Sequence, residues 1–150
     1  MQDIPAIQLN RLTKRFDKVT ACDSIDLTVK RGEILALLGE NGSGKTTLTN
    51  MLSGIYQPDS GQILLDGKPV RIRSPRDAIR LGIGMIHQHF KLVEVLTARE
   101  NILLGQAGLI RIKPEDAVHE MGFQVDLDRK VYDMSVSEKQ AVEILKVLCR

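Results

Sequence analysis

The chain has 150 residues, of which 43% are hydrophobic and 27% charged, and its formal net charge is +2. This balance is usual for a folded domain large enough to bury a core. No block of about five like charges and no run of roughly 18 apolar residues occurs, which argues against a nucleic-acid-binding tail and a membrane-spanning helix. Two cysteines, Cys22 and Cys149, are too few for a disulfide framework, so we expect both to be small buried residues.

The first third of the sequence predicts strands. Apolar residues alternate at 7 and 9, and again at 25, 27 and 29, which is the pattern of half-buried strands. A polar stretch containing Phe16 lies between them. The continuous apolar run from Ile34 to Leu38 predicts a strand buried on both faces, in the middle of a sheet. A glycine-rich loop follows, and then a helix over about residues 46–53 that Gly54 would close.

The middle of the chain predicts turns, short strands and one helix. Residues 58–61 predict a turn, residues 63–65 a short strand, and Asp66 with Gly67 a hairpin turn. Ser74 and Pro75 are typical of an N-cap and a first helical residue. Residues 83–86 predict another strand. Four basic residues without interleaved aromatics indicate a solvated surface rather than a nucleic-acid site: Arg71, Arg73, Arg76 and Arg80.

The last third predicts helices. Thr97 with Glu100, and Ser135 with Glu138, have the spacing of a capping box. The final helix would carry an apolar stripe, formed by Ala141, Leu145 and Leu148. A strand-rich start, one strand–loop–helix unit and a helical tail together predict an α/β nucleotide-binding core with inserted subdomains.

The most specific motif is the sequence Gly-Glu-Asn-Gly-Ser-Gly-Lys-Thr at residues 39–46, which fits the P-loop pattern G-x-x-x-x-G-K-[ST]. Glycines let successive backbone N–H groups converge on phosphate oxygens, and the following helix adds its dipole. Lys45 is expected to reach the β- and γ-phosphates, and the Thr46 hydroxyl to hold Mg²⁺. The expected nucleotide-binding residues are Gly39, Glu40, Asn41, Gly42, Ser43, Gly44, Lys45, Thr46 and Thr47.

No D-x-x-G or N-K-x-D sequence occurs, which argues against a GTPase. From about Ala6 to Arg150 the chain instead resembles ABC ATPases. This resemblance implies ATP and Mg²⁺ as cofactors, and an α/β P-loop NTPase core with an antiparallel β-subdomain and a helical subdomain. It also implies a division into the core with its β-subdomain at about 1–95, the helical subdomain with the signature at about 96–140, and the start of a return to the core at about 141–150.

Two further positions acquire roles through this resemblance. Phe16 matches the aromatic residue that stacks on adenine, although a core phenylalanine is the alternative. Gln88 matches the Q-loop glutamine, which contacts Mg²⁺ and the attacking water and senses the transport partner. Its amide can both donate and accept a hydrogen bond, which suits orienting a water. The resemblance therefore makes Lys45 and Gln88 the catalytic candidates, and Thr46 and Gln88 the metal ligands.

Residues 134–140 stand where the family has its Leu-Ser-Gly-Gly-Gln signature, which closes over the γ-phosphate of the opposite subunit. Ser135, Ser137 and Glu138 are the nucleotide-contacting candidates here. Val136 and Ser137 replace the two glycines, and Ala141 replaces a usual arginine. We expect the Ser137 side chain to weaken this loop's grip on phosphate.

A carboxylate strand for hydrolysis, the Walker B motif with its catalytic glutamate, is missing from the 150 residues. Asp66 ends an apolar run, but Gly67 follows it, as in a hairpin. The family's carboxylate strand pairs beside residues 34–38 and would follow Arg150. We therefore expect little hydrolysis from this chain alone, and an exposed apolar edge that favours aggregation.

Segments 50–54, 58–67 and 84–105 are similar to the first domain of tandem ATPases in importers of simple sugars and nucleosides. This implies permease subunits and a second ATPase domain as partners, no nucleic acid, and a peripheral position on the cytoplasmic side of the membrane. One alternative is a short nucleotide-binding module, or a fragment, that binds ATP without hydrolysing it. Another is a non-transport ABC ATPase of DNA repair or translation, which residues 88–104 argue against.

Overall fold

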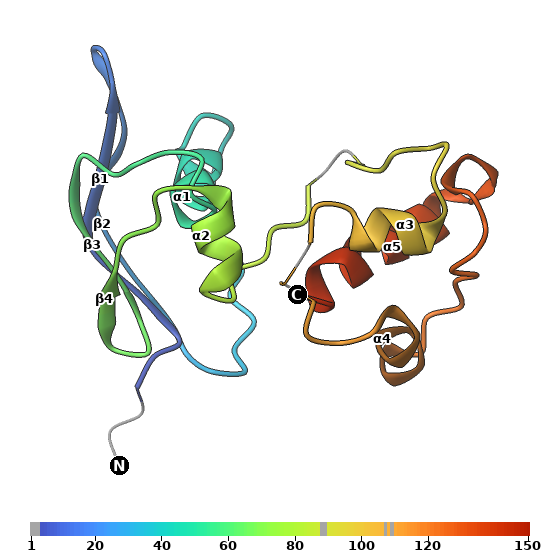
Figure 1. The fold of residues 1–150 in the computed structure, drawn as a ribbon. Helices are drawn as coiled ribbons and strands as arrows, with labels where there is room; N and C mark the ends of the chain where they lie inside the picture. Colours follow the sequence, from blue (N-terminus) through green and yellow to red (C-terminus); the bar gives the residue numbers. More distant parts are fainter. Residues whose placement is uncertain (1–3, 88–89, 107, 109) are drawn as a thin grey trace. The chain divides into compact units, whose positions relative to one another are not determined.

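The computed structural model describes residues 4–87, 90–106, 108 and 110–150. The chain folds into two compact units, Met1–Ala78 and Ile79–Arg150, and each is described by itself (Figure 1). The boundary expected near residue 95, between the core and the helical subdomain, does not coincide with this division at residue 78 and stays a prediction. Within the described residues, no helix has both the length and the apolar character needed to cross a membrane.

The first unit contains an antiparallel sheet. Its strands β1 (Ile7–Phe16), β2 (Val19–Val29), β3 (Ser60–Leu65) and β4 (Lys68–Val70) lie in the order β2-β1-β3-β4. Leu9 of β1 faces Leu27 on β2 and Ile63 on β3, and both Leu9 and Ile63 are buried. The predicted alternation is therefore confirmed, but β1 extends through Phe16, where the sequence predicted a polar connection.

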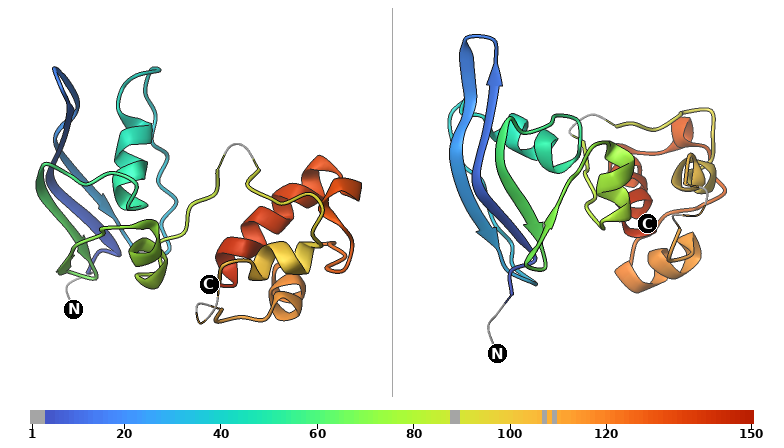
Figure 2. Two further views of the ribbon diagram at one scale, coloured as in Figure 1. Left: turned by 45° about the horizontal axis from the view of Figure 1, so that its top comes forward. Right: turned by 60° about the vertical axis from the view of Figure 1, so that its left-hand side comes forward.

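Helix α1 (Lys45–Leu52) lies beside this sheet, as Figures 1 and 2 show. It turns Leu48 and Met51 into the core. Gly54, just past its end, adopts the left-handed conformation with φ of 76°, which closes the helix as predicted. The helix thus fixes the loop that precedes it against the sheet.

The predicted hairpin turn and helix start of the first unit are confirmed, whereas residues 60 and 61 of the turn predicted at 58–61 belong to β3. Asp66 and Gly67 connect β3 to β4 with positive φ angles of 49° and 74°, as a two-residue hairpin requires. Helix α2 (Pro75–Arg80) begins after Ser74, whose Oγ accepts a hydrogen bond from the Asp77 N–H at 3.2 Å. Asp66 also forms an ion pair with Arg31 at 2.6 Å.

The strands predicted at residues 34–38 and 83–86 are absent, since both segments lack strand structure. Ile34 is 99% exposed and Leu38 is 89% exposed. A strand buried on both faces needs hydrogen-bonded neighbours and a layer on each face. None of the strands in the described residues lies beside either segment. The apolar residues of these segments therefore favour strands, but the segments have no neighbouring strand to pair with in this structure.

The second unit is helical. It contains α3 (Ala98–Leu103), α4 (Pro114–Met121), the short 3₁₀ helix η1 (Val131–Asp133) and α5 (Val136–Leu148), and both α3 and α4 pack on α5. Both predicted capping boxes are confirmed, at the starts of α3 and α5. The core consists of Ala98, Ile102, Ala117, Leu127, Val131, Met134, Val142, Leu145 and Cys149.

The predicted stripe on the last helix needs a correction. Ala141 and Leu145 are buried, but Leu148 is only partly buried, and the fully buried face is formed by Val142, Leu145 and Cys149. These three residues are spaced by three and four, which keeps them on one side of an α-helix. Burial of Cys149, and of Cys22 in the first unit, confirms the reading of both as small buried residues.

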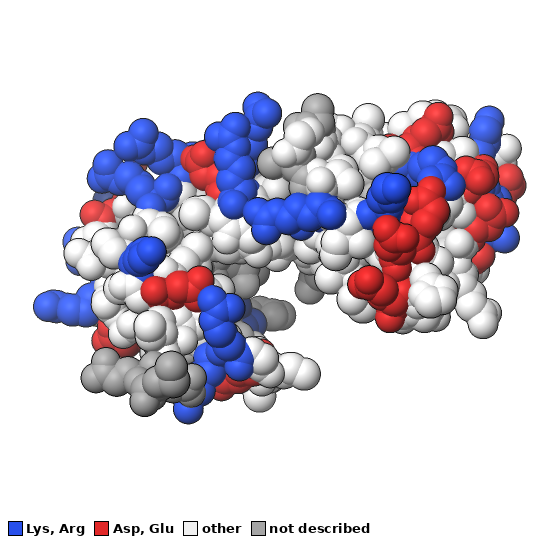
Figure 3. Space-filling view, turned by 60° about the horizontal axis from the view of Figure 1, so that its bottom comes forward, with Lys and Arg blue, Asp and Glu red and all other residues white. Residues whose placement is uncertain are grey.

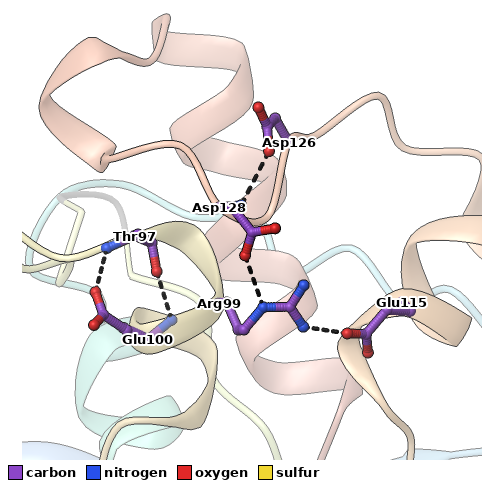
Figure 4. A network of polar contacts seen from close by, with 6 residues as sticks. All are labelled: Thr97, Arg99, Glu100, Glu115, Asp126 and Asp128. Atoms are coloured by element: carbon purple, nitrogen blue, oxygen red, sulfur yellow. Dashed lines mark hydrogen bonds and ion pairs between the residues drawn. The ribbon is translucent and has the colours of Figure 1, made fainter.

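A polar network ties α3 to α4 and to the loop before η1 (Figure 4). Arg99 binds the carboxylates of Asp128, at 2.9 Å, and Glu115. The hydrogen bonds to Asp128, which has the larger effect, and to Glu115 raise the pKa of Arg99 above its usual value. The Asp128 N–H donates to Asp126 at 3.0 Å, so the loop is held in a fixed turn.

Basic and acidic side chains occur together on the face drawn in Figure 3. In the middle of the chain, Arg71, Arg73, Arg76 and Arg80 are all exposed. Their interpretation as a solvated surface stays a prediction.

Asn101 holds the segment before α3, and its replacement is expected to loosen that segment. Its Oδ1 accepts the Val93 N–H at 2.7 Å, while its Nδ2 donates to the carbonyls of Val93 and Thr97, each at 3.0 Å. Asn101→Ala should cost about 2–3 kcal/mol, because buried backbone groups lose their partners. Native-state hydrogen exchange over residues 91–104 measures this loss. The control is Leu103→Ala at a half-exposed site on the same helix; an equal effect there would contradict the prediction.

The exposed apolar segment at residues 34–38 is expected to make the isolated 150-residue chain self-associate. Ile34→Lys with Leu38→Lys should lower this association, since each buried leucine or isoleucine contributes about 1.5–3 kcal/mol at an apolar contact. Sedimentation velocity measures it. Val19→Lys, at another exposed apolar site of the first unit, is the control. A monomeric wild-type chain with a cooperative, high-temperature melt would contradict the expectation.

Candidate nucleotide-binding site

The loop between residues 39 and 45 is organised around the ammonium group of Lys45. Its Nζ donates hydrogen bonds to the carbonyls of Gly39 and Glu40, both at 2.7 Å, and to the Ser43 hydroxyl at 3.0 Å. The Ser43 N–H also bonds the Glu40 carbonyl at 3.2 Å. A cation therefore already lies inside the curl of the loop, where phosphate oxygens would find a positive charge together with backbone donors.

Two glycines of this loop lie close to neighbouring atoms. A Cβ on Gly44, whose φ is 87°, would lie 2.2 Å from the Ala21 carbonyl oxygen, so the loop is seated directly against β2. A Cβ on Gly39 would lie 2.7 Å from Ser43 Oγ and 3.7 Å from Lys45 Nζ. The flexible Ser43 side chain could shift to make room for that Cβ, and Gly39 does not have a positive φ. Of these two glycines, Gly44 is therefore the one required by close approach as well as by backbone angle.

The loop leads directly into α1, so the N-terminus of the helix adjoins the loop. Gly44 is the N-cap without a side-chain cap, and its carbonyl accepts the Leu48 N–H at 2.9 Å. The first-turn N–H groups remain without a capping side chain, and no acidic residue lies in that turn. This positive end suits an anion. Thr46 is exposed and Thr47 partly buried in the same turn, while Asn41 and Gly42 form the exposed tip of the loop.

Phe16, the candidate for adenine stacking, is not a core residue, because its side chain is 39% exposed. Its ring packs edge-on against Tyr56, with centroids 5.1 Å apart and planes at 72°. Lys14 Nζ lies 5.4 Å from the Phe16 ring centroid. Tyr56, which follows α1, belongs to no motif that could have marked it in the sequence. Stacking of Phe16 on adenine stays a prediction.

Asp59 anchors the end of β1 that carries Phe16. It accepts the Arg15 N–H at 2.7 Å and binds Lys14 Nζ at 2.9 Å. The Arg15 N–H and then the Lys14 ammonium hold the pKa of Asp59 below its usual value. The sequence predicted only a turn here, but the carboxylate also fixes the position of the aromatic residue.

The signature expected at Ser135 forms the N-terminus of α5, in the second unit. The Glu138 carboxylate accepts hydrogen bonds from the Ser135 N–H and hydroxyl, each at 2.8 Å, and it pairs with Arg129. The Ser135 N–H, followed by the hydroxyl, holds the pKa of Glu138 below its usual value. Ser137 Oγ lies 3.0 Å from Ser135 Oγ. The serine hydroxyls are therefore engaged with each other and with Glu138.

Gln88, the remaining catalytic and metal-binding candidate, lies outside the described residues. Among the residues that are described, no group of three or more histidines, cysteines, aspartates or glutamates could hold a metal ion. Asp66 is occupied by Arg31 in its hairpin. Thr46, whose hydroxyl the motif predicts as a Mg²⁺ ligand, is exposed in the first turn of α1, and this role stays a prediction.

Comparisons with known proteins identify the family. The sequence profile of the ABC transporter family matches residues 22–150. The ribose import ATP-binding protein RbsA of Caldanaerobacter subterraneus is 46% identical over 154 residues, which cover 96% of this chain and 31% of the relative. The guanosine import ATP-binding protein NupO of Bacillus subtilis is 46% identical over 153 residues, covering 96% and 30%. The chain thus spans about a third of the length of these relatives.

Solved structures show the same fold. The protein cbiO1 of Clostridium perfringens, described as part of the ABC transporter complex cbiONQ, superimposes with a TM-score of 0.79 at 28% identity, covering 97% of this chain and 61% of that one. MJ1267, an ATP-binding cassette of an ABC transporter in its ADP conformation, gives 0.83 at 22% identity, covering 97% and 65%, and bears on the fold alone. A family profile that matches most of the chain, with a P-loop built around Lys45, shows that the chain belongs to the ABC transporter family.

Proposed function

We propose that this chain is the ATP-binding part of an importer for a sugar or a nucleoside, in which ATP binding and hydrolysis drive transport. The observation that carries the ATP-binding half is the position of the Lys45 ammonium inside the loop, with three oxygen acceptors that phosphate oxygens would replace. The importer half is supported by the similarity to RbsA and NupO.

Each part of the site would contribute in a different way. Lys45 would neutralise charge on the β- and γ-phosphates, while the loop N–H groups and the start of α1 supply fixed donors that need no rearrangement. Thr46 Oγ is the proposed Mg²⁺ ligand, with Gln88 as the second. When bound, the metal would neutralise phosphate charge. Phe16, held by Asp59 and Tyr56, would provide an aromatic surface for the base.

Hydrolysis by these 150 residues alone is proposed to be slow. Their sequence contains no apolar run ending in Asp-Glu that could supply a water-activating carboxylate. Losing a positioned base typically costs about 10² to 10⁴ in rate. A nucleotide-binding module without turnover is therefore the second candidate. Reading the gene beyond Arg150 separates the two, since an apolar strand ending in Asp-Glu supports the ATPase and a stop codon supports the module.

The proposed partners follow from the import function. Permease subunits would contact the helical part of the chain and move with it. A second ATPase domain would place its own signature segment opposite the P-loop of this chain. The chain would then lie on the cytoplasmic side of the membrane as a peripheral component. Co-purification of the complete gene product with a permease tests this arrangement, and its absence in native membranes would count against it.

Lys45→Ala is expected to weaken Mg²⁺-ATP binding to the complete gene product by about tenfold to a hundredfold. A charge-assisted hydrogen bond contributes about 1.5–3 kcal/mol, and the loop also loses its internal cross-links. Equilibrium binding of labelled ATP measures the change. Lys18→Ala, which removes an exposed lysine elsewhere in the first unit, is the control. Unchanged binding in the Lys45 variant would sink the nucleotide-binding assignment.

Ser137→Gly is expected to raise the ATPase rate of the complete, permease-bound protein. The change removes the side chain beside Ser135 Oγ, so that the backbone N–H groups at the start of α5 can approach phosphate more closely. One regained hydrogen bond is worth about 1 kcal/mol, or roughly fivefold in rate. Steady-state hydrolysis measures it, with Ser24→Gly, at an exposed site on β2 whose positive φ suits glycine, as the control for general effects of the substitution. A lower rate would mean that the Ser137 hydroxyl itself contacts phosphate.

A further inference from the structure

The segment that precedes α3 is attached to one side of α5 by both main-chain groups of a single residue. The Lys91 N–H donates to Glu143 Oε1 at 2.6 Å, and the Lys91 carbonyl accepts from Lys146 Nζ at 2.9 Å. Glu143 and Lys146 are three residues apart, so they lie side by side on the helix. Together they hold the Lys91 peptide from both sides.

The attachment continues toward the N-terminus of α5. Lys139 Nζ lies 3.3 Å from a carboxylate oxygen of Glu94, one turn before Glu143. Glu94 and Leu96 then accept hydrogen bonds from the N–H groups of Tyr132 and Val131, both at 3.0 Å. Residues 91–96 are therefore tied along α5 and to the short helix that directly precedes the signature at Ser135.

Glu143 is the unusual member of this attachment. Its side chain is only 3% exposed, and its helical neighbours Val142 and Leu145 belong to the apolar core. Burying a charge is unfavourable unless it is compensated, so an apolar side chain would suit packing at least as well. What a carboxylate adds is a strong acceptor for the Lys91 N–H. Its negative charge also acts on partly buried Arg150, whose pKa is lowered by burial and raised in part by Glu143.

We propose that Glu143 is a positioning residue that makes residues 91–96 and α5 move as one body, so that displacement of this segment is transmitted to Ser135. The role rests on the proposed import function, because coupling has meaning only where ATP binding drives a partner. Residues 91–96 follow Gln88, the proposed nucleotide sensor, in the sequence. Glu143 would thus link residues 91–96 to α5, and the relative position of these two segments would set how ATP binding is coupled to transport.

The test uses the complete gene product assembled with its permease. Glu143→Met keeps the length and apolar packing but removes the acceptor, whereas Glu143→Gln keeps an acceptor oxygen. Glu120→Met, at an exposed site on α4, is the control. Two quantities are measured: hydrogen exchange of the amides in residues 91–96, and solute transported per ATP hydrolysed.

Glu143→Met is expected to speed exchange at Lys91 by about tenfold or more, since its amide loses the Glu143 acceptor. Transport per ATP should fall by about fivefold, with ATP affinity unchanged, because hydrolysis continues without moving the signature helix. Glu143→Gln and Glu120→Met should stay within about twofold of wild type in both quantities.

Three results would overturn the positioning role: unchanged exchange in Glu143→Met, a parallel fall of transport and hydrolysis, or a Glu143→Gln variant that behaves like Glu143→Met. The second would assign Glu143 to stability alone. Failure of the wild-type protein to bind ATP would overturn the proposed function together with the coupling role. If the wild-type protein binds ATP, any of the three results above overturns only the coupling role. The two failures are therefore distinguishable.

Discussion

The ammonium group of Lys45 is the centre on which the nucleotide-binding half of the molecule is arranged. It bonds two carbonyls and a hydroxyl of the loop that precedes it. Gly44 seats this loop directly against β2. The sheet and α1 thus hold in place the loop whose oxygen atoms surround the lysine. Preorganisation of this kind is what phosphate binding requires.

The second unit depends on a comparable arrangement around α5. A capping box between Ser135 and Glu138 forms the N-terminus of this helix. Charged side chains farther along the helix bind residues 91–96. Apolar packing alone would hold α5 against α3 and α4. The polar attachments add a defined position for the segment between Gln88 and α3, which is the property that a coupling element needs.

The largest departure from the sequence-based expectation is the apolar run at residues 34–38. Its composition predicts a central strand, yet the run has no strand structure and is exposed, with Ile34 and Leu38 almost fully accessible. Local preference does not make a strand without hydrogen-bonding neighbours, and those neighbours come from other parts of a fold. Residues 83–86 differ for the same reason. By contrast, β1, β2, the β3–β4 hairpin and the capped helices follow their local patterns.

The sequence by itself determined the features that local chemistry controls. The spacing of Gly39, Gly44 and Lys45 predicted the phosphate loop, and the Thr97 and Ser135 boxes predicted two helix starts, because turn angles and caps depend on neighbouring residues in the chain. Only the tertiary structure decided the contacts between distant residues. It placed Tyr56 and Asp59 around Phe16 and brought the Glu143 carboxylate to the Lys91 N–H. No sequence pattern specifies such pairs, because they arise from how separate elements pack.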